Sequence, residues 1–239
     1  MGLSVGFRRL RCSIPGVVEF LDQYRPDVLF LGDLGVQRNK IGRLKLRIEE
    51  AMNEEWFLLT DIRAAPGYPI GIGVLIHSSA AKYTSKIPLV KPPDVDEVQW
   101  HLAVEGRVFG LTLARPGMPE PISLIGVNQH TASDNNAHLR SILLSTLSLT
   151  KDRLPSTSRR LICLGDFNAA PKGGRWGYSR NSKTRQADQL TSNWASQNKF
   201  QEVRSSQLKA TWRTCLHSKK AALDRAWVSP KDLPTSPLL

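Results

Sequence analysis

Short apolar runs alternate along the chain with segments in which apolar residues recur three or four positions apart. The runs have the length of strands, and those without polar interruption predict strands buried on both faces. They are residues 3–8, 28–31, 56–62, 70–77, 107–113, 122–127 and 161–164. The helical spacing occurs at residues 14–24, 41–53, 135–150 and 186–198 and predicts helices that cover a sheet. Together these patterns predict an α/β protein.

A further pair of strands is predicted around the dipeptide Glu105-Gly106. Residues 98–104 and 107–113 flank it, and both contain apolar residues in partial alternation. A two-residue connection ending in glycine is a common signal for a β-hairpin. We therefore expect residues 98–113 to form a hairpin.

The segment 161–171, Leu-Ile-Cys-Leu-Gly-Asp-Phe-Asn-Ala-Ala-Pro, carries the strongest chemical signal in the chain. Its apolar run predicts a buried strand, and Gly165 allows a sharp turn where the strand leaves the core. The turn presents Asp166 and Asn168 two residues apart. A carboxylate at such a place can hold a metal ion or orient a water, and an amide can donate to a phosphate oxygen. An ordinary Asp/Asn turn after a core strand is the alternative.

The same pattern occurs early in the chain, where four apolar residues at 28–31 are followed by Gly32-Asp33. Two strands that each end in an aspartate at the same end would bring both carboxylates to one edge of the core. A divalent cation requires such a set of oxygen ligands. Asp33 and Asp166 are therefore candidate metal ligands.

The positive charge is concentrated in the last third of the chain. The net charge is +12, and residues 151–239 hold 17 Lys and Arg against 6 Asp and Glu, a net charge of +11. A basic surface binds a polyanion by releasing condensed counterions, so nucleic acid is the expected partner. A basic surface that only aids solubility is the alternative.

Part of this charge lies directly after the Asp166 turn. Basic and aromatic residues alternate there with glycines, a composition typical of an arm that grips phosphates and stacks a base or sugar. The residues concerned are Lys172, Arg175, Trp176, Tyr178, Arg180, Lys183 and Arg185. A solvated loop without a ligand has a similar composition.

No apolar run approaches the length of a membrane span, so we expect no membrane contact. The three cysteines are widely scattered and form no metal-ligand pair. Reduced thiols of this kind indicate an intracellular protein, which allows a nuclear location.

The tetrapeptide at 165–168, Gly-Asp-Phe-Asn, resembles the signature of the endonuclease/exonuclease/phosphatase superfamily, and in particular the endonuclease domain of LINE-type (non-LTR) retrotransposons. Residues 25–33 and 71–76 are similar to two further strands of that superfamily. Thr211 and Trp212 resemble its Thr-Trp strand, and residues 222–229 resemble its Asp-containing strand through Asp224.

The resemblance implies a single domain over residues 1–239, built as a four-layer sandwich of two mixed β-sheets flanked by helices. It implies metal-dependent nicking of DNA with Mg²⁺ or Mn²⁺, in which Asp33 and Asp166 hold the metal and Asp166 also orients the attacking water. Asn168 would stabilise the phosphate and Asp224 would orient a histidine. Thr211 and Trp212 join the expected DNA-binding residues, and a reverse transcriptase encoded by the same element is an expected partner.

Four positions differ from the family pattern. Gly6 stands where an asparagine is expected, Asp33 replaces a glutamate, and Asn128 replaces a tyrosine. The terminal Ser-Asp-His is missing, so we expect the domain to be incomplete at its C-terminus and to lack its last strand. His130 is a candidate phosphate ligand or proton carrier in this altered site. Impaired activity is therefore expected, and the alternatives are a catalytically dead nucleic-acid-binding remnant and a phosphatase acting on a small phosphoester.

Overall fold

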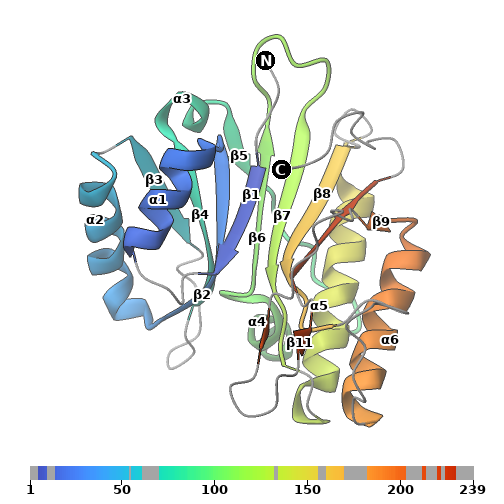
Figure 1. The fold of residues 1–239 in the computed structure, drawn as a ribbon. Helices are drawn as coiled ribbons and strands as arrows, with labels where there is room; N and C mark the ends of the chain where they lie inside the picture. The colour runs from blue at the N-terminus through green and yellow to red at the C-terminus, as the bar shows by residue number, and fades with distance from the viewer. Residues whose placement is uncertain are drawn as a thin grey trace.

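Two β-sheets lie face to face between outer helices in the computed structural model (Figure 1). This arrangement is the predicted α/β sandwich of two mixed sheets with helices outside, and the prediction of the fold class is confirmed. The structure describes residues 5–9, 14–53, 55–60, 70–131, 134–155, 160–169, 182–202, 212–213, 220–221 and 224–229.

The first sheet contains four strands in the order β1-β2-β4-β3. Strands β1 and β2 are parallel, whereas β4 runs antiparallel to both of its neighbours, β2 and β3. The strands are β1 (Val5–Arg9), β2 (Val28–Val36), β3 (Trp56–Thr60) and β4 (Ile70–His77).

The second sheet contains six strands in the order β5-β6-β7-β8-β12-β9. Only β7 and β8 are parallel, and the other neighbouring pairs are antiparallel. The strands are β5 (Thr84–Lys86), β6 (Val108–Leu113), β7 (Ile122–Asn128), β8 (Arg160–Asp166), β9 (Gln201–Glu202) and β12 (Asp224–Val228), and a separate two-stranded ribbon joins β10 (Trp212–Arg213) to β11 (Lys220–Ala221).

Helices cover the outer face of each sheet, as Figure 1 shows. Helices α1 and α2 pack on the first sheet, and α5 and α6 pack on the second. The helices are α1 (Ile14–Tyr24), α2 (Ile41–Ala51), α3 (Ser78–Ala81), α4 (Glu97–Val104), α5 (Asp134–Arg153) and α6 (Ser182–Gln197), with a short 3₁₀ turn η2 (Arg38–Lys40) before α2.

Strand β2 shows how the apolar runs create these layers. Successive side chains of a strand point to opposite faces. Leu29 and Leu31 pack against α1 and α2, whereas Val28 and Phe30 pack between the two sheets. All four side chains are fully buried, which explains why this run has no polar alternation.

The two sheets approach each other very closely at Gly126 in β7. A Cβ atom at this position would lie 2.1 Å from Cδ1 of Phe30 in the opposite sheet. Only a residue without a side chain allows the ring of Phe30 to occupy this place. Glycine in the middle of an apolar strand therefore sets the spacing of the sheets.

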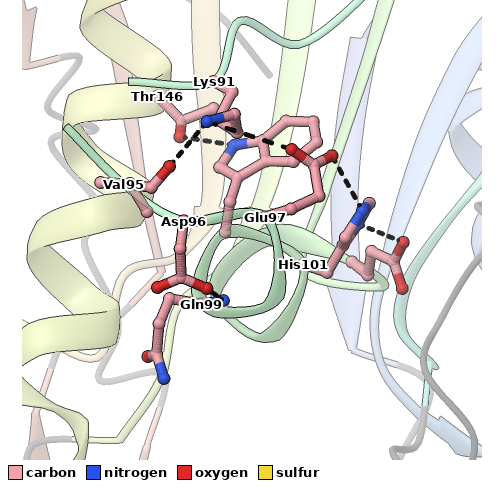
Figure 2. Close-up of polar contacts among 9 residues, drawn as sticks. Lys91, Val95, Asp96, Glu97, Gln99, His101 and Thr146 are labelled. Carbon is pink, nitrogen blue, oxygen red and sulfur yellow. Dashed lines mark hydrogen bonds and ion pairs between the residues drawn. The ribbon is translucent and has the colours of Figure 1, made fainter. Parts of the chain in front are cut away.

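The predicted hairpin at 98–113 is wrong in its first half, because Glu97–Val104 forms helix α4. The Asp96 side chain caps the helix by accepting a hydrogen bond from the Gln99 amide at 3.0 Å (Figure 2). Trp100 Nε1 donates to Thr146 Oγ1 of α5 at 3.1 Å, which anchors α4 to its neighbour. The N-cap and this tertiary contact outweigh the partly alternating sequence.

None of the described helices is both long enough and apolar enough to cross a membrane.

Candidate active site

The carboxyl ends of β7 and β8 lie side by side and carry the polar residues singled out in the sequence. The two strands are parallel, and their register places Asn128 opposite Asp166. The Gln129 amide donates to the Asp166 carbonyl oxygen at 2.7 Å. In return, Asn168 Nδ2 donates to the Gln129 carbonyl oxygen at 2.6 Å. These bonds fix the two loops that follow the strands against each other.

The turn after β8 has the geometry expected of an Asp-x-Asn segment. The Asn168 amide donates to Asp166 Oδ1 at 2.8 Å, and Asn168 has a φ of 46°. Asparagine tolerates this left-handed conformation better than most residues do. The bond holds the Asp166 carboxylate, which is only 3% exposed, in one orientation.

Asn128 links this edge of the second sheet to the first sheet. Its Nδ2 donates to the Gly71 carbonyl oxygen at 2.9 Å and lies 3.4 Å from Asp33 Oδ1. Asp33 also has a left-handed φ of 54°, a strained conformation of the kind that functional sites often hold. Asn128 therefore contacts Asp33 of the first sheet through its side chain and pairs with Asp166 of the second sheet through its main chain.

Arg107 is a member of this site that the sequence did not single out. Its carbonyl oxygen accepts from the Asn128 amide at 2.8 Å, which fixes its backbone beside β7. Burial lowers the pKa of the Arg107 guanidinium, while the negative charges of Asp33 and Asp166 act in the opposite direction. The guanidinium thus lies within the electrostatic field of both carboxylates.

Helix α4 brings Arg107 to this position. His101 lies between Glu97 of the helix and Glu105 just after it. Its Nε2 is 3.1 Å from Glu97 Oε1 (Figure 2), and its Nδ1 is 2.6 Å from Glu105 Oε1. The helix ends at Val104, and the following turn carries Gly106 with a φ of 64°. The turn then directs the chain into β6. Because the sequence pattern predicts a hairpin at residues 98–113, it offers no reason to place Arg107 near the two aspartates.

The side chain of His130 contacts helix α4. This side chain is buried, and its Nε2 lies 3.0 Å from the Ala103 carbonyl oxygen, so Nε2 carries the proton. Burial, together with the positive charges of Arg107 and Arg140, lowers the pKa of His130 to about 4. The imidazole is therefore neutral at neutral pH and links β7 to α4. Its predicted role at a phosphate stays a prediction.

This burial predicts a pH-dependent stability. The folded-state pKa of His130 is about 4 and its ordinary value is 6.5, so protonation favours the unfolded chain. The neutral imidazole contributes about 3 kcal/mol to the free energy of unfolding above pH 6.5, and this contribution is lost as the pH falls toward 4. Urea unfolding should show this loss in the parent. A His130→Gln variant keeps a donor for Ala103 without titrating, and an equally steep loss in that variant would contradict the assignment.

Only some of the remaining predicted site residues are among the residues that the structure describes. The main chain of Asp224 pairs with that of Asp166 in the register of β12 and β8. Trp212 begins β10, and Arg185 is exposed on α6. Lys183 belongs to α6, but its side chain lies outside the described residues. Thr211 and the arm residues Lys172, Arg175, Trp176, Tyr178 and Arg180 lie outside them as well.

The two aspartates at this edge have the side-chain chemistry that a magnesium-like cation binds. The Asp33 carboxylate contacts Asn128 Nδ2, and the main chain of Asp166 pairs with that of Asn128. Mg²⁺ commonly binds through one or two carboxylates and completes its shell with water and substrate phosphate. Among the described residues, no cluster of three or more His, Cys, Asp or Glu side chains forms a metal site. A site built on Asp33 and Asp166 would need water and substrate phosphate to complete the shell of the cation.

Two facing mixed sheets, with polar residues gathered at the ends of β7 and β8, define a DNase-like α/β sandwich. The chain belongs to the endonuclease/exonuclease/phosphatase family, whose model matches residues 6–237. The resemblance stated from the sequence is confirmed. No individual curated protein sequence matches the chain significantly.

Solved structures with this fold are similar to the chain despite low sequence identity. The catalytic domain of APE2 from Xenopus laevis is 13% identical with a TM-score of 0.69, covering 95% of this chain and 82% of that one. The Neisseria 3′ phosphatase NExo, bound to a product DNA hairpin, is 17% identical with a TM-score of 0.63, covering 96% and 88%. The endonuclease domain of TRAS1, a telomere-specific non-LTR retrotransposon, is 9% identical with a TM-score of 0.58, covering 96% and 86%.

Proposed function

We propose that the protein is a divalent-metal-dependent phosphodiesterase that nicks DNA, of the retrotransposon-endonuclease type. The observation that supports this proposal best is that Asp33 contacts the side chain of Asn128, whose main chain pairs with that of Asp166. The family includes endonucleases, and its similar structures include a DNA-bound 3′ phosphatase and a retrotransposon endonuclease domain. The basic last third of the chain favours DNA over a small substrate.

Each polar residue of the edge has a distinct part in this proposal. Asp33 and Asp166 would hold Mg²⁺ or Mn²⁺, which when bound supplies positive charge that neutralises the scissile phosphate. The Asp166 carboxylate orients the attacking water and accepts its proton. Asn168 donates one amide hydrogen to the Gln129 carbonyl, and in this proposal its second hydrogen donates to a phosphate oxygen. Asp224, whose main chain adjoins Asp166, would act through a partner, and we assign His130 no step.

Incubation of the purified protein with supercoiled plasmid tests the proposal. Relaxed circles should form with Mg²⁺ or Mn²⁺ and should not form with EDTA. Salt-sensitive binding without nicking would contradict the proposal and indicate a catalytically dead DNA-binding remnant. Hydrolysis of a small phosphoester without DNA cleavage would contradict it equally and indicate a phosphatase.

The charge of Arg107 gives a further prediction about the same edge. Replacing Arg107 by glutamine removes a positive charge near Asp33 and Asp166. A cation held by the two carboxylates would then bind more tightly, by roughly fivefold. Loss of the free Mn²⁺ signal in electron paramagnetic resonance measures this affinity.

The control for Arg107→Gln is Arg115→Gln, which makes the same change of charge elsewhere. Arg115 Nη2 lies 2.8 Å from Asp27 Oδ1, immediately before the start of β2, whereas Asp33 lies within the strand, six residues after Asp27. We expect this variant to bind Mn²⁺ with the affinity of the parent. Unchanged or weaker Mn²⁺ binding by Arg107→Gln would show that Asp33 and Asp166 do not share a cation.

A further inference from the structure

A buried arginine of α5 lies directly behind the loops of the candidate site. Arg140 is 1% exposed, and it follows the helical spacing of Leu143 and Leu147, which belong to the core. A guanidinium is costly to bury unless acceptors surround it. Arg140 on this apolar stripe must therefore have hydrogen-bond acceptors around it.

The contacts of Arg140 join three segments that are distant in sequence. Nη1 donates to the carbonyl oxygen of His130, after β7. Nη2 donates to the carbonyl oxygen of Phe167, after β8, at 3.3 Å. On α6, Nη2 also donates to Thr191 Oγ1 at 3.3 Å and lies 3.5 Å from the Ala187 carbonyl oxygen.

These acceptors alternate with the residues of the site. His130 lies two positions after Asn128, and Phe167 stands between Asp166 and Asn168. On the site side, the loops are joined by the bonds of Gln129 with Asp166 and Asn168. On the core side, Arg140 joins the same two loops.

We propose that Arg140 is a positioning residue that fixes the spacing between segments 128–130 and 166–168. Through their main chain it sets where the side chains of Asn128, Asp166 and Asn168 stand. This consequence for catalysis rests on the proposed function, but the effect on the two loops does not. Arginine suits the role because its planar guanidinium presents several donors in a fixed geometry, whereas lysine presents its donors from one atom.

Hydrogen exchange followed by mass spectrometry tests the proposal on the metal-free protein. The amides of Gln129, His130 and Asn168 are hydrogen-bonded and should exchange slowly in the parent. In Arg140→Met their exchange should accelerate by at least about tenfold, the effect of losing charged hydrogen bonds. Arg140→Lys should show a similar acceleration, because lysine keeps the positive charge but lacks the planar set of donors of the guanidinium group.

A gentler pair of variants guards against a failure of Arg140→Met to fold. Thr191→Val removes one acceptor of Arg140 and should accelerate loop exchange by about fivefold. Thr146→Val is its control, because Thr146 is equally buried. Thr146 accepts a hydrogen bond of 3.1 Å from Trp100 Nε1 of α4, which belongs to neither loop. The proposal is overturned if Thr191→Val affects the two loops no more than Thr146→Val does.

Manganese binding provides a second readout that a general loss of stability would not produce. If the loops carry the metal site, Arg140→Lys should weaken Mn²⁺ binding by roughly tenfold, as changes behind metal ligands commonly do. The Thr146→Val control should bind with the parent affinity. A wild-type protein that fails to nick plasmid would refute the proposed function, whereas only unchanged loop exchange would refute the role of Arg140.

Discussion

Replacement of Asp166 by asparagine is expected to lower the rate of metal-dependent plasmid nicking by a hundredfold or more, on the order of the loss when one member of a catalytic unit is removed. Asparagine has nearly the same shape, and its side-chain oxygen can still accept from the Asn168 amide, as Asp166 Oδ1 does at 2.8 Å. The loop should therefore keep its conformation. What is lost is the negative charge that would bind the cation and accept a proton.

Asp96→Asn is the matched control for this variant. The Asp96 carboxylate also accepts a local main-chain hydrogen bond, from the Gln99 amide at 3.0 Å, but it caps α4 in an exposed position. Its replacement should leave nicking at the parent rate. If Asp166→Asn retains the parent rate, with equal metal dependence, Asp166 has no part in the reaction.

The second large effect concerns stability, and it is expected at Gly165, immediately before Asp166. This glycine has a φ of 141°, and a Cβ atom added to it would lie 2.0 Å from the Val127 carbonyl oxygen of β7. The colliding atom belongs to the backbone of a paired strand, so no side chain can rotate away. Gly165→Ala should cost at least about 4 kcal/mol, which places it among the exceptional substitutions. For a chain of this length, the melting temperature should fall by about 10 °C.

Gly42→Ala makes the same chemical change where it should do no harm. Gly42 lies in α2, and a Cβ atom there would meet nothing within 4 Å. Alanine favours a helix interior over glycine by about 1 kcal/mol, so this variant should be as stable as the parent or slightly more stable. Thermal unfolding of both variants decides the matter, and a Gly165→Ala protein with the parent melting temperature would contradict the described turn.

Much of the fold could be predicted because buried strands leave a clear trace in sequence. The runs at 28–31 and 161–164 lie in the interior of the two sheets, where both faces of a strand are covered. Each run is followed by a glycine and an aspartate, which mark the end of β8 at Asp166, whereas β2 continues beyond Asp33 to Val36. Parallel strands present their carboxyl ends to one side, and this geometry links the pattern to a site.

Residues 98–104 are predicted as a strand but belong to helix α4, because the local pattern alone does not decide their conformation. Val98, Trp100 and Leu102 alternate with polar residues as in a strand. The helix forms because Asp96 caps it and because Trp100 and Val104 have partners on neighbouring elements. Partners of this kind come from distant parts of the chain, and the local pattern does not contain them.

The same limit explains why two arginines of the site region were missed. Arg107 lies within the electrostatic field of the carboxylates because the chain turns at Gly106 after the end of α4, so its place depends on a helix that the local pattern did not predict. Arg140 did leave a trace, since it shares the helical spacing of Leu143 and Leu147. A charged residue on a buried stripe requires acceptors, and here they are main-chain carbonyls of two loops.

The central claim is that Asp33 and Asp166 converge on one divalent cation. Crystals soaked in Mn²⁺ test it directly, because anomalous scattering locates the metal without any assumption about activity. We predict an anomalous peak in contact with carboxylate oxygens of both Asp33 and Asp166. Manganese bound only at other places, with neither carboxylate in contact with it, would contradict the claim.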